Sequence, residues 1–589
     1  MCGIAGIMTR GGVRPDAAVL DALADALAHR GPDGRGRALG GSVGLVQTRL
    51  AIIDLETGGQ PFFDSEGRAL VANGEIYNHV ELRDSLADTA FASASDCEPP
   101  LHLYRRSGLA FTERLRGMYA IALHDPAAGG KPERLVLARD PFGIKPLYYA
   151  ETEAGFGFAS EPQALVAAGL AAPLVNETAR SEVLQLQFST GSECLFAGIR
   201  RVLPGETLVI EDGRVTERRR RPALPQGGPL DRDEAEALRD LDAALEDSVG
   251  LHQRSDVPYG MFLSGGIDSS ALLVLMARLN ERPVLAFTAH FPGTGVHDER
   301  EAARAVARAA GAEHVEVPFS EADFWRILPQ AAAAMDDPAA DYAILPTFLL
   351  AEEARKSVKV ILSGEGGDEL FGGYGRYRAA IRPWPLARRM RRKGTFDGLD
   401  VLRDPPSGWR DGIAAAERAE AAGGRTRLQT IQATDCADWL PNDLLTKLDR
   451  CLMAHGVEGR VPFLDPVVAD LAFRLPDRLK VRGSLGKWLL RRWLRDRSRD
   501  AGALLPKRGF TVPVGEWIAA RASRLAPLVA ARPCIAGLCR PGAIEPLFAA
   551  AGKGREGFAA WTLLFYALWH RRHMEGREPN EDVFESLAD

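Results

Sequence analysis

The sequence predicts a two-domain protein: an α+β domain, then an α/β domain whose parallel sheet is doubly wound and whose C-terminal part is mainly helical. Three observations support this fold class. Over about the first 200 residues, short apolar runs alternate with Gly and Asp turns. From about residue 233, strands alternate with longer helices, and beyond about residue 375 the pattern is mainly helical. At about 150 residues per domain, a chain of 589 residues has room for two to four domains.

Composition excludes several classes of protein. Hydrophobic residues make up 46% and charged residues 26%, which is typical of a globular protein. The formal charge is 73 − 79 = −6, so we expect no general attraction to nucleic acid or to anionic membranes. No apolar run approaches the ~18 residues that a membrane-spanning helix needs. Seven cysteines without CxxC pairs indicate reduced thiols, and therefore a cytoplasmic protein.

The first domain is expected over residues 1–210 and a linker over residues 211–235. Helical stretches are predicted near residues 16–29 and 79–87. The linker contains a run of four consecutive arginines, Arg218–Arg221, which we interpret as a solvated charge run followed by Pro and Gly. The predicted strands of the first domain are Gly44–Val46, Leu50–Ile53, Ala69–Ala72, Tyr119–Leu123 and Leu135–Leu137.

The second domain is expected over residues 236–589. Its strand–helix alternation is the βαβ pattern, which places ligands at the carboxyl ends of parallel strands. Helices are predicted at Ser269–Leu279 and Glu299–Ala310. The predicted strands are Gly260–Leu263, Val284–Thr288, Glu313–Val317 and Val358–Leu362.

Cys2 follows the initiator Met and precedes the small residue Gly3. Removal of Met1 would make Cys2 the first residue, and its free α-amino group could then act as the base for its own thiol. Taken alone, a cysteine in second place carries little weight. Its significance comes from polar groups that end or interrupt apolar strands farther along the chain: His29–Asp33, Thr48–Asp54, Asn73–Asn78 and Ser95–Asp96.

Together with Met1–Ile4, these motifs resemble the class II glutamine amidotransferase domain across about residues 1–205. The resemblance implies an Ntn-type αββα fold in which a thiol attacks the side-chain amide of glutamine and releases ammonia. It implies that Asn73 and Gly74 stabilise the oxyanion. Arg49 would pair with the α-carboxylate of glutamine, and Glu75 and Asp96 would hold its α-ammonium.

A glycine-rich loop follows the first predicted strand of the second domain and opens a helix. Its glycines let the backbone approach an anion, and its hydroxyls and helix N-terminal amides can donate to phosphate oxygens. No GxxxxGK[ST] motif occurs in this loop. The loop resembles the PP-loop of ATP pyrophosphatases, a fold of the adenine nucleotide α-hydrolase type, in which it binds pyrophosphate. The residues concerned are Leu263, Ser264, Gly265, Gly266, Asp268, Ser269 and Ser270, and Asp268 is expected to help hold Mg²⁺.

A second loop begins at Ser363 and Gly364, which we include among the ATP-binding residues, and carries three acids within five residues. Such acids repel one another unless a cation or an ammonium joins them. Asp368 suits Mg²⁺ coordination, and Glu365 suits orienting or deprotonating incoming ammonia. Glu369 is predicted to bind an ammonium of the acceptor substrate.

Three later stretches, 444–450, 456–465 and 486–491, extend the resemblance over nearly the whole chain to glutamine-hydrolysing asparagine synthetases. The resemblance implies that Lys487 stabilises the acyl-adenylate and the departing pyrophosphate, whereas a lysine there would otherwise be read as a surface residue. Asp449 and Arg450 would line the active site or the passage between the domains, or would form a structural ion pair. The cofactors implied are ATP, as co-substrate, and Mg²⁺.

The expected reaction joins ammonia from glutamine to the β-carboxylate of aspartate through an acyl-AMP. A carboxylate oxygen is a poor leaving group, so adenylation must precede amidation, and ammonia must travel unprotonated through a dry internal route. The same machinery acting on another carboxylate, such as a peptide, an N-acyl dipeptide or a polysaccharide acid, is the near alternative. Two departures from the family pattern keep it open: Cys97–Pro100 after Asp96, and Gly459 in place of a larger residue.

A non-catalytic binding protein on the same fold is an alternative from another class, against which the complete set of candidate catalytic residues argues. The basic stretch Arg388–Lys393 is expected to be a solvated face, and the aromatic stretch Trp561–Trp569 a core-packing helix. Relatives are often dimers, so a homodimer is expected by analogy only.

Overall fold

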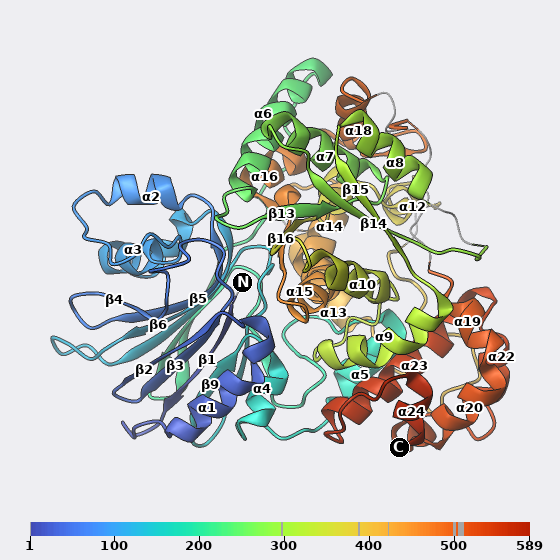
Figure 1. The fold of residues 1–589 in the computed structure, drawn as a ribbon, viewed down its shortest axis with the longest axis horizontal. Helices are drawn as coiled ribbons and strands as arrows, with labels where there is room; N and C mark the ends of the chain where they lie inside the picture. The colour runs from blue at the N-terminus through green and yellow to red at the C-terminus, as the bar shows by residue number, and fades with distance from the viewer. Residues whose placement is uncertain are drawn as a thin grey trace.

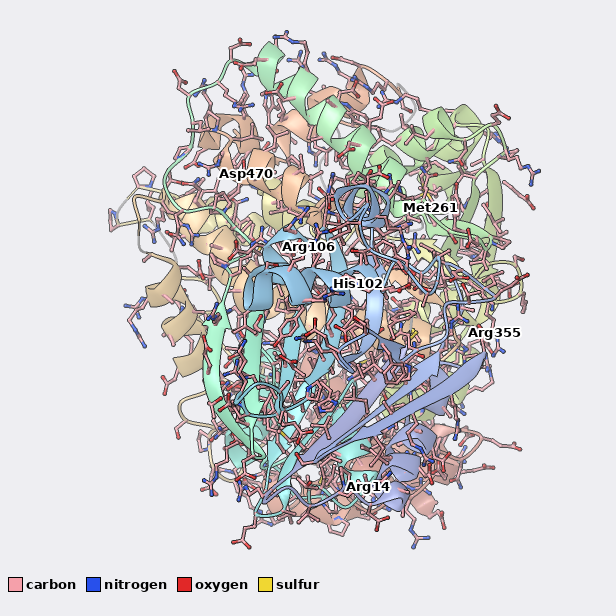
Figure 2. The ribbon with its side chains drawn as sticks, turned by 90° about the vertical axis from the view of Figure 1, so that its left-hand side faces the viewer. Arg14, His102, Arg106, Met261, Arg355 and Asp470 are labelled. Atoms are coloured by element: carbon pink, nitrogen blue, oxygen red, sulfur yellow. The ribbon has the colours of Figure 1, made fainter. Side chains whose placement is uncertain are left out.

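A computed structural model describes residues 2–589 apart from 296–298, 384, 387–388, 422, 499–501 and 505–511. The N-terminal β-rich part and the larger C-terminal part lie side by side (Figure 1). In the side view, Arg14, His102 and Arg106 mark the first part and Met261 and Asp470 the second (Figure 2). The chain begins at the junction between the two parts (Figure 1).

Two six-stranded antiparallel sheets form the N-terminal part. In spatial order the first sheet contains β10 (Arg200–Arg201), β8 (Tyr148–Glu151), β9 (Gly155–Ala159), β1 (Gly3–Thr9), β3 (Val43–Arg49) and β2 (Gly34–Gly40). The second contains β12 (Arg214–Arg220), β11 (Glu206–Glu211), β7 (Arg134–Arg139), β6 (Gly117–Asp125), β5 (Ala69–Ile76) and β4 (Phe62–Phe63). The helical segments of this part are α1 (Ala17–Ala26), η1 (Ala28–Arg30), α2 (His79–Ser85), α3 (Pro99–Ser107), η2 (Gly108–Arg114), α4 (Pro162–Ala167) and α5 (Glu177–Leu186).

Alternation along the strands produces four layers. In β1, Ile4 and Met8 join the core between the two sheets, whereas Ala5 and Ile7 face the other way, where α1 and α4 pack. In the second sheet, Val71 joins the inner core and Leu70 the outer core beneath α2 and α3. The order of layers is therefore helix, sheet, sheet, helix, as expected of an Ntn-type αββα domain.

Two local expectations for this part were wrong. Leu50–Ile53 forms no strand: β3 ends at Arg49, and the backbone oxygen of Ile52 instead accepts from the amide of Asp256 in the C-terminal part. These apolar residues are buried by the other domain rather than by a neighbouring strand. The segment expected as a linker from residue 211 begins with β12, so three residues of the run Arg218–Arg221 lie in an edge strand.

Five parallel strands form the central sheet of the C-terminal part. Their spatial order is β15 (Glu313–Pro318), β14 (Leu285–His290), β13 (Tyr259–Phe262), β16 (Val360–Leu362) and β17 (Glu458–Arg460). The chain leaves β13 to one side to form β14 and later returns on the other side to form β16. The carboxyl ends of β13 and β16 are therefore adjacent at a topological switch point, where open α/β sheets bind their ligands.

Helices cover this sheet and make up most of the remaining chain (Figure 1). The helices before η3 are α6 (Glu234–His252), α7 (Ile267–Leu279), α8 (Arg300–Ala309), α9 (Glu321–Ala334), α10 (Ile344–Ala354), α11 (Gly367–Phe371), α12 (Gly375–Ala380), α13 (Asp411–Glu420) and α14 (Arg427–Thr434). The π-helix η3 (Asp435–Leu445) is followed by α15 (Thr446–Met453), η4 (Pro462–Leu464), α16 (Pro466–Arg474), α17 (Asp477–Lys480), the hairpin β18 (Val481–Arg482) and β19 (Leu485–Gly486), and α18 (Trp488–Arg495). The last helices are α19 (Val514–Ala520), α20 (Ala522–Ala531), α21 (Pro533–Leu538), α22 (Ile544–Ala549), α23 (Gly554–His573) and α24 (Val583–Ala588).

The sequence pattern missed β17 within a region expected to be helical. Its residues are Glu458, Gly459 and Arg460, which carry none of the β-branched or aromatic side chains typical of strands. All three are buried, and Arg460 Nε donates to Glu458 Oε1 at 2.6 Å. Mutual pairing of the two charges allows both side chains to be buried in this edge strand.

The aromatic stretch near the C-terminus forms the helix α23, as predicted, and its tryptophans are in the core. Trp561 is 1% exposed, and its indole Nε1 donates to the backbone oxygen of Ala340 at 2.7 Å. Trp569 Nε1 donates to the backbone oxygen of Asp336 at 3.1 Å. Among the residues that the structure describes, no helix combines the length and apolar character that crossing a bilayer requires.

We expect Trp561→Ala to destabilise the C-terminal part by about 3–5 kcal/mol, because it leaves a cavity and removes the indole hydrogen bond to the Ala340 carbonyl. Calorimetry would detect this as a lower midpoint for the C-terminal transition, since a protein of two domains need not unfold in one step. Phe558→Ala on the same helix is the matched control, because Phe558 is 42% exposed. Equal shifts in the two variants would contradict the assignment of Trp561 to the core.

Candidate active sites

Cys2 is buried directly before β1, and both its thiol and its backbone form hydrogen bonds. Gln47 Nε2 donates to Cys2 Sγ at 3.0 Å, and the backbone N–H of Cys2 donates to Asn73 Oδ1 at 3.1 Å. Arg30 Nε donates to the Cys2 carbonyl at 3.3 Å. Burial raises the pKa of the Cys2 thiol. A thiol in this setting needs a nearby base to become a nucleophile.

Asn73 and Gly74 lie in β5 opposite the first sheet. Asn73 is fully buried, and although its Oδ1 is engaged by Cys2, its Nδ2 lacks a hydrogen-bond partner among the described residues. A buried amide donor left open beside a thiol is the arrangement expected where an oxyanion has to be stabilised. A Cβ on Gly74 would lie 2.0 Å from the carbonyl oxygen of Met118, so only glycine fits there.

The acids predicted to bind the glutamine ammonium are both buried. Burial, reinforced by Glu458 and Asp96, raises the pKa of Glu75 well above its usual value. Asp96 Oδ2 accepts from the backbone N–H of Ile76 at 2.7 Å, yet burial still raises its pKa. An arriving ammonium would relieve this excess of buried negative charge.

Arg49 ends β3, and its guanidinium lies against the loop that follows. Nη2 contacts the backbone oxygens of Ile53, at 3.5 Å, and Asp54, and Nη1 contacts that of Leu55 at 3.4 Å. These carbonyls fix the direction of the side chain but provide no carboxylate. Among the described residues, no acidic side chain pairs with Arg49.

The two loops predicted to bind ATP meet at the adjacent ends of β13 and β16. The best-defined contact between them runs through Lys487, which donates to Asp268 in the first loop and to Asp368 Oδ1, at 2.8 Å, in the second. Lys487 is 3% exposed, which excludes the surface-lysine interpretation. Burial alone would lower the pKa of Lys487, but Asp268 and Asp368 outweigh it and raise that pKa.

Glycines bring these charged groups together. A Cβ on Gly373 would lie 1.9 Å from Asp368 Oδ1 and 2.3 Å from Lys487 Cε. On Gly367 it would lie 2.5 Å from Asp268 Oδ1, and on Gly364 it would lie 3.0 Å from Asp268 Cβ. Larger residues at these positions would therefore push the two loops apart.

The first loop also carries the predicted hydroxyls. Ser264 Oγ lies 3.1 Å from Ser269 Oγ, and Gly266 N donates to Ser264 Oγ at 3.4 Å. Ser270 Oγ is buried without a partner among the described residues, in the first turn of α7. Gly265 adopts φ +62°, a conformation that favours glycine. Leu263 itself is core: its N–H donates to the Phe287 carbonyl at 2.8 Å.

The second loop places its acids differently. Ser363 N donates to the Arg460 carbonyl at 2.8 Å, which ties the loop to β17. Glu365 Oε2 is buried without a hydrogen-bond partner in the described part of the chain. Glu369 is 1% exposed and accepts from Tyr374 Oη at 2.7 Å. Burial, followed by repulsion from Asp368, raises the pKa of Glu369 to about 7.

Comparison with known proteins identifies both halves. The glutamine amidotransferase domain profile matches residues 1–220, and the asparagine synthase profile matches residues 240–571. The chain belongs to the asparagine synthase family. It is accordingly a carbon–nitrogen ligase that uses glutamine as amide donor, with the N-terminal part as its glutaminase domain and the C-terminal part as its synthetase domain.

Several relatives align over most of the chain. A Mycobacterium tuberculosis protein provisionally named a glutamine-hydrolysing asparagine synthetase is 35% identical over 98% of both chains. The glutamine-hydrolysing asparagine synthetase 1 of Bacillus subtilis is 31% identical over 99% of this chain and 98% of its own. The amidase chyE of Penicillium rubens is 28% identical over 84% of each chain. Proteins similar to this synthetase thus carry more than one activity name.

Asp449 and Arg450 of the synthetase belong to a buried ion-pair network at the domain junction. Arg30 Nη1 of the glutaminase domain lies 2.7 Å from Glu161 Oε1 and 2.8 Å from Asp449 Oδ2. Arg450 Nη1 lies 3.0 Å from the same Asp449 oxygen, and its Nε lies 2.7 Å from Asp336 Oδ1. These contacts give Asp449 and Arg450 a structural pairing.

The donor set of the synthetase suits a magnesium ion. Asp268 and Asp368 converge on one ammonium nitrogen, so a single cation can reach both carboxylates. Mg²⁺ is usually held by one or two protein carboxylates together with substrate phosphates and water. Among the described residues, no cluster of three or more His, Cys, Asp or Glu side chains forms a metal site from protein ligands alone.

Three functional candidates of the synthetase were missed from the sequence: Gln47, Arg460 and Lys145. Gln47 binds the thiol, as described above. Arg460 Nη2 lies 3.3 Å from Glu75 Oε2, across the domain junction. Lys145 Nζ donates to the Gly459 carbonyl at 3.3 Å, and burial lowers its pKa. Only Arg460 lies within a quoted motif, and nothing in the sequence indicates which distant acid it meets.

The departures from the family pattern are accommodated by close packing. Cys97 Sγ donates to Asp96 Oδ2 at 3.4 Å and to the Gly74 carbonyl at 3.5 Å, so the thiol supplies the donor that a threonine hydroxyl would. A Cβ on Gly459 would lie 3.2 Å from Leu448 and 3.3 Å from Leu452. The missing side chain of Gly459 therefore leaves the space that Leu448 and Leu452 of α15 occupy.

The basic stretch 388–393 is not simply a solvated face. Arg388 lies outside the described residues, but Met390 is 3% exposed and Arg391 stacks at 5.0 Å over Phe188 and 4.8 Å over Trp439. Part of the stretch therefore packs against the glutaminase domain and η3. Arg389, Arg392 and Lys393 are exposed, as expected.

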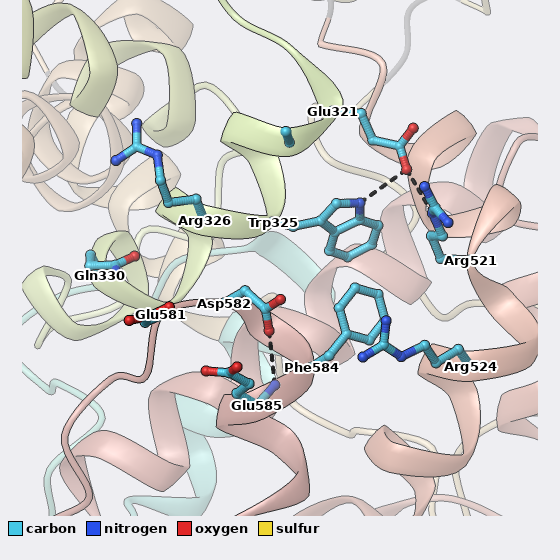
Figure 3. Close-up of a pocket in the computed structure, with 11 residues that line it drawn as sticks. Glu321, Trp325, Arg326, Gln330, Arg521, Arg524, Glu581, Asp582, Phe584 and Glu585 are labelled. Atoms are coloured by element: carbon cyan, nitrogen blue, oxygen red, sulfur yellow. Dashed lines mark hydrogen bonds and ion pairs between the residues drawn. The ribbon is translucent and has the colours of Figure 1, made fainter.

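A hollow of about 850 Å³ lies away from both centres, between α9, α20 and α24 (Figure 3). Trp325 and Phe584 form its apolar wall, with ring centroids 5.0 Å apart, and Arg524 lies 4.0 Å over the Phe584 ring. None of the predicted site residues lines it. Its size alone assigns it no role.

We expect Gly373→Ala to lower ATP-dependent amide formation by the synthetase at least about tenfold, because the added methyl displaces Asp368 from Lys487. Glutaminase activity without ATP should persist, since Cys2 lies in the other domain. Gly375→Ala is the matched control, because a Cβ there meets only Arg378 Nη2, at 3.5 Å. Full synthesis by Gly373→Ala would disprove the importance of this contact.

Proposed function

We propose that this synthetase converts L-glutamine, L-aspartate, ATP and water into L-glutamate, L-asparagine, AMP and pyrophosphate through a β-aspartyl-AMP intermediate. The observation that carries the proposal is the contact of Lys487 with both Asp268 and Asp368 at the switch point of the parallel sheet. A buried cation held by two loop carboxylates suits transfer of an adenylyl group better than simple ligand binding. It also argues against a non-catalytic role for the chain.

In the glutaminase domain, we propose that loss of Met1 frees the amino group of Cys2, which accepts the proton of its own thiol. The thiolate then attacks the side-chain carbonyl of glutamine. Asn73 Nδ2 and the Gly74 N–H donate to the oxyanion, ammonia leaves, and water hydrolyses the thioester to glutamate. Arg49 pairs with the α-carboxylate, and Glu75 and Asp96 bind the α-ammonium. The open Asn73 donor supports this assignment.

In the synthetase domain, the β-carboxylate of aspartate attacks the α-phosphorus of ATP, and the bond to pyrophosphate breaks. Lys487 and the donors of the first loop, including Ser264 and Ser270, stabilise the charge that develops on the phosphate oxygens. Asp268 and Asp368 would hold Mg²⁺, which supplies further positive charge to those oxygens. Ser363 and Gly364 line the opposite side of the phosphate site.

Ammonia then attacks the acyl-AMP carbonyl, and AMP leaves. Glu365 is proposed to accept the proton that the amine loses, and its unpartnered Oε2 supports this. Glu369 binds the α-ammonium of aspartate in competition with its Tyr374 contact. We place the enzyme in the cytoplasm, a compartment that fits its seven free cysteines, and propose a homodimer by analogy with relatives.

A second candidate is the same chemistry on another carboxylate, such as a peptide, an N-acyl dipeptide or a polysaccharide acid. It is supported by similarity to proteins named amidases and by Gly459, which departs from the family pattern. Both candidates share every step on the glutamine side. They differ only in the acid that is adenylated.

We expect Cys2→Ala to reduce glutamine-dependent amide formation and glutamate release at least about a hundredfold, since the nucleophile is lost. Synthesis from ammonium salts should stay within about twofold, because ammonia supplied in solution does not need the Cys2 thiol. Coupled assays for glutamate and AMP would measure both reactions. Cys534→Ala controls for removing a cysteine elsewhere. Unchanged glutamine-dependent activity in Cys2→Ala would rule out the proposed nucleophile.

The acceptor is tested by ATP–pyrophosphate exchange over a panel of carboxylic acids. Aspartate should support the fastest exchange, because adenylation precedes use of ammonia and needs no glutamine. Acidic peptides and N-acyl dipeptides form the rest of the panel. Exchange with one of these but not with aspartate would favour the second candidate.

A further inference from the structure

Arg460 contacts residues of both centres. Its side chain reaches Glu75 in the glutamine site, where Nη2 lies 3.3 Å from Oε2. Its backbone oxygen accepts the N–H of Ser363, the first residue of the second ATP loop, at 2.8 Å. A single residue of β17 therefore spans the interval between the two sites.

The rest of the Arg460 guanidinium is fixed. Nε donates to Glu458 at 2.6 Å, and Nη1 donates to the carbonyls of His252, at 2.8 Å, and Arg254, at 2.7 Å. Nη2 makes no hydrogen bond to the described residues and has only the ion pair with Glu75. Arg460 is 0% exposed, so water cannot replace that partner.

Charge is unbalanced around this guanidinium. Glu75, Glu458 and Asp96 are all buried. Burial, followed by repulsion from Glu458 and Asp96, raises the pKa of Glu75, although Arg460 opposes this. An α-ammonium at Glu75 would supply the missing positive charge. Arg460 would then pair with Glu458 alone, to which its Nε donates at 2.6 Å.

We propose that Arg460 couples the two centres: glutamine bound at Glu75 fixes Arg460 on Glu458, and the Arg460 backbone then holds Ser363 and its loop in the ATP-binding position. This rests on the proposed assignment of Glu75 to the glutamine ammonium. Arg460 acts here as a positioning residue and takes no part in chemistry. Because coupling between sites is reciprocal, ATP must tighten glutamine binding by the same factor.

The test measures glutamine binding by calorimetry in the Cys2→Ala protein, which cannot hydrolyse it. Titrations are made without and with α,β-methylene-ATP and magnesium, so no acceptor is required. We expect the analogue to tighten glutamine binding about tenfold, within the usual range of coupling. In Cys2→Ala/Arg460→Lys the factor should fall below about twofold, because lysine keeps the charge but has one nitrogen for two acids.

Arg116→Lys in the same background is the matched control. Arg116 Nε also forms an ion pair across the junction, 2.7 Å from Asp465 Oδ2, but the pair touches neither centre. The tenfold factor should survive there. The proposal would be overturned if the ATP analogue did not tighten glutamine binding in the Cys2→Ala protein. It would also be overturned if the tightening persisted in Cys2→Ala/Arg460→Lys. Loss of this tightening in both the Arg460→Lys and Arg116→Lys variants would also overturn the proposal, because it would show that any weakening of the domain junction abolishes the coupling.

A second readout uses the enzyme with Cys2 intact. Arg460→Lys should unfold in calorimetry with the same number of transitions as the unmodified protein, which shows that it folds. Its glutaminase should no longer respond to ATP, so glutamate formed per AMP should rise several-fold. An unchanged ratio would contradict coupling through Arg460. Absence of any synthesis with aspartate in the unmodified protein would refute the proposed acceptor instead, while leaving the binding test intact.

Discussion

The buried guanidinium of Arg30 is the constraint on which the arrangement of the two domains depends. It is fully buried, and it bonds to Glu161 in its own domain, to Asp449 in the other and to the carbonyl of Cys2. Removing one partner of such a charge typically costs about 3–5 kcal/mol, because the other remains buried and uncompensated. Docking of the two domains and placement of Cys2, the proposed nucleophile, therefore depend on the same guanidinium.

The order of the elements could be predicted from the sequence because each depends on local pattern. Alternating apolar residues indicated β5, β6 and β7, and glycines before a helix indicated the loop at Gly265. The adjacency of the two ATP loops followed from βαβ topology, since parallel strands end at the same edge. The roles of Asn73 and Lys487 came from a family resemblance, and the structure adds the contacts that make those roles physically reasonable.

What could not be predicted depends on contacts between distant segments. Leu50–Ile53 has the composition of a strand, but the Ile52 carbonyl accepts from Asp256 across the domain junction. The Ala51 N–H donates to Asp33 within its own domain. Arg460 looks too polar for the parallel sheet until its guanidinium is seen to pair with Glu75 of the other domain. A one-dimensional pattern records hydrophobicity and spacing, and it contains no term for a charge that is balanced by a residue hundreds of positions away.

The small size of Gly459 links its identity to that of its neighbours. With no side chain there, Leu448 and Leu452 settle directly on β17, and the helix that carries them also carries Asp449. A bulkier residue at this position would lift α15 from the sheet and draw Asp449 away from Arg30. A homologue with a larger residue at this position must therefore have smaller residues in place of Leu448 and Leu452, or a displaced helix. Substitutions at these three positions are consequently expected to occur together.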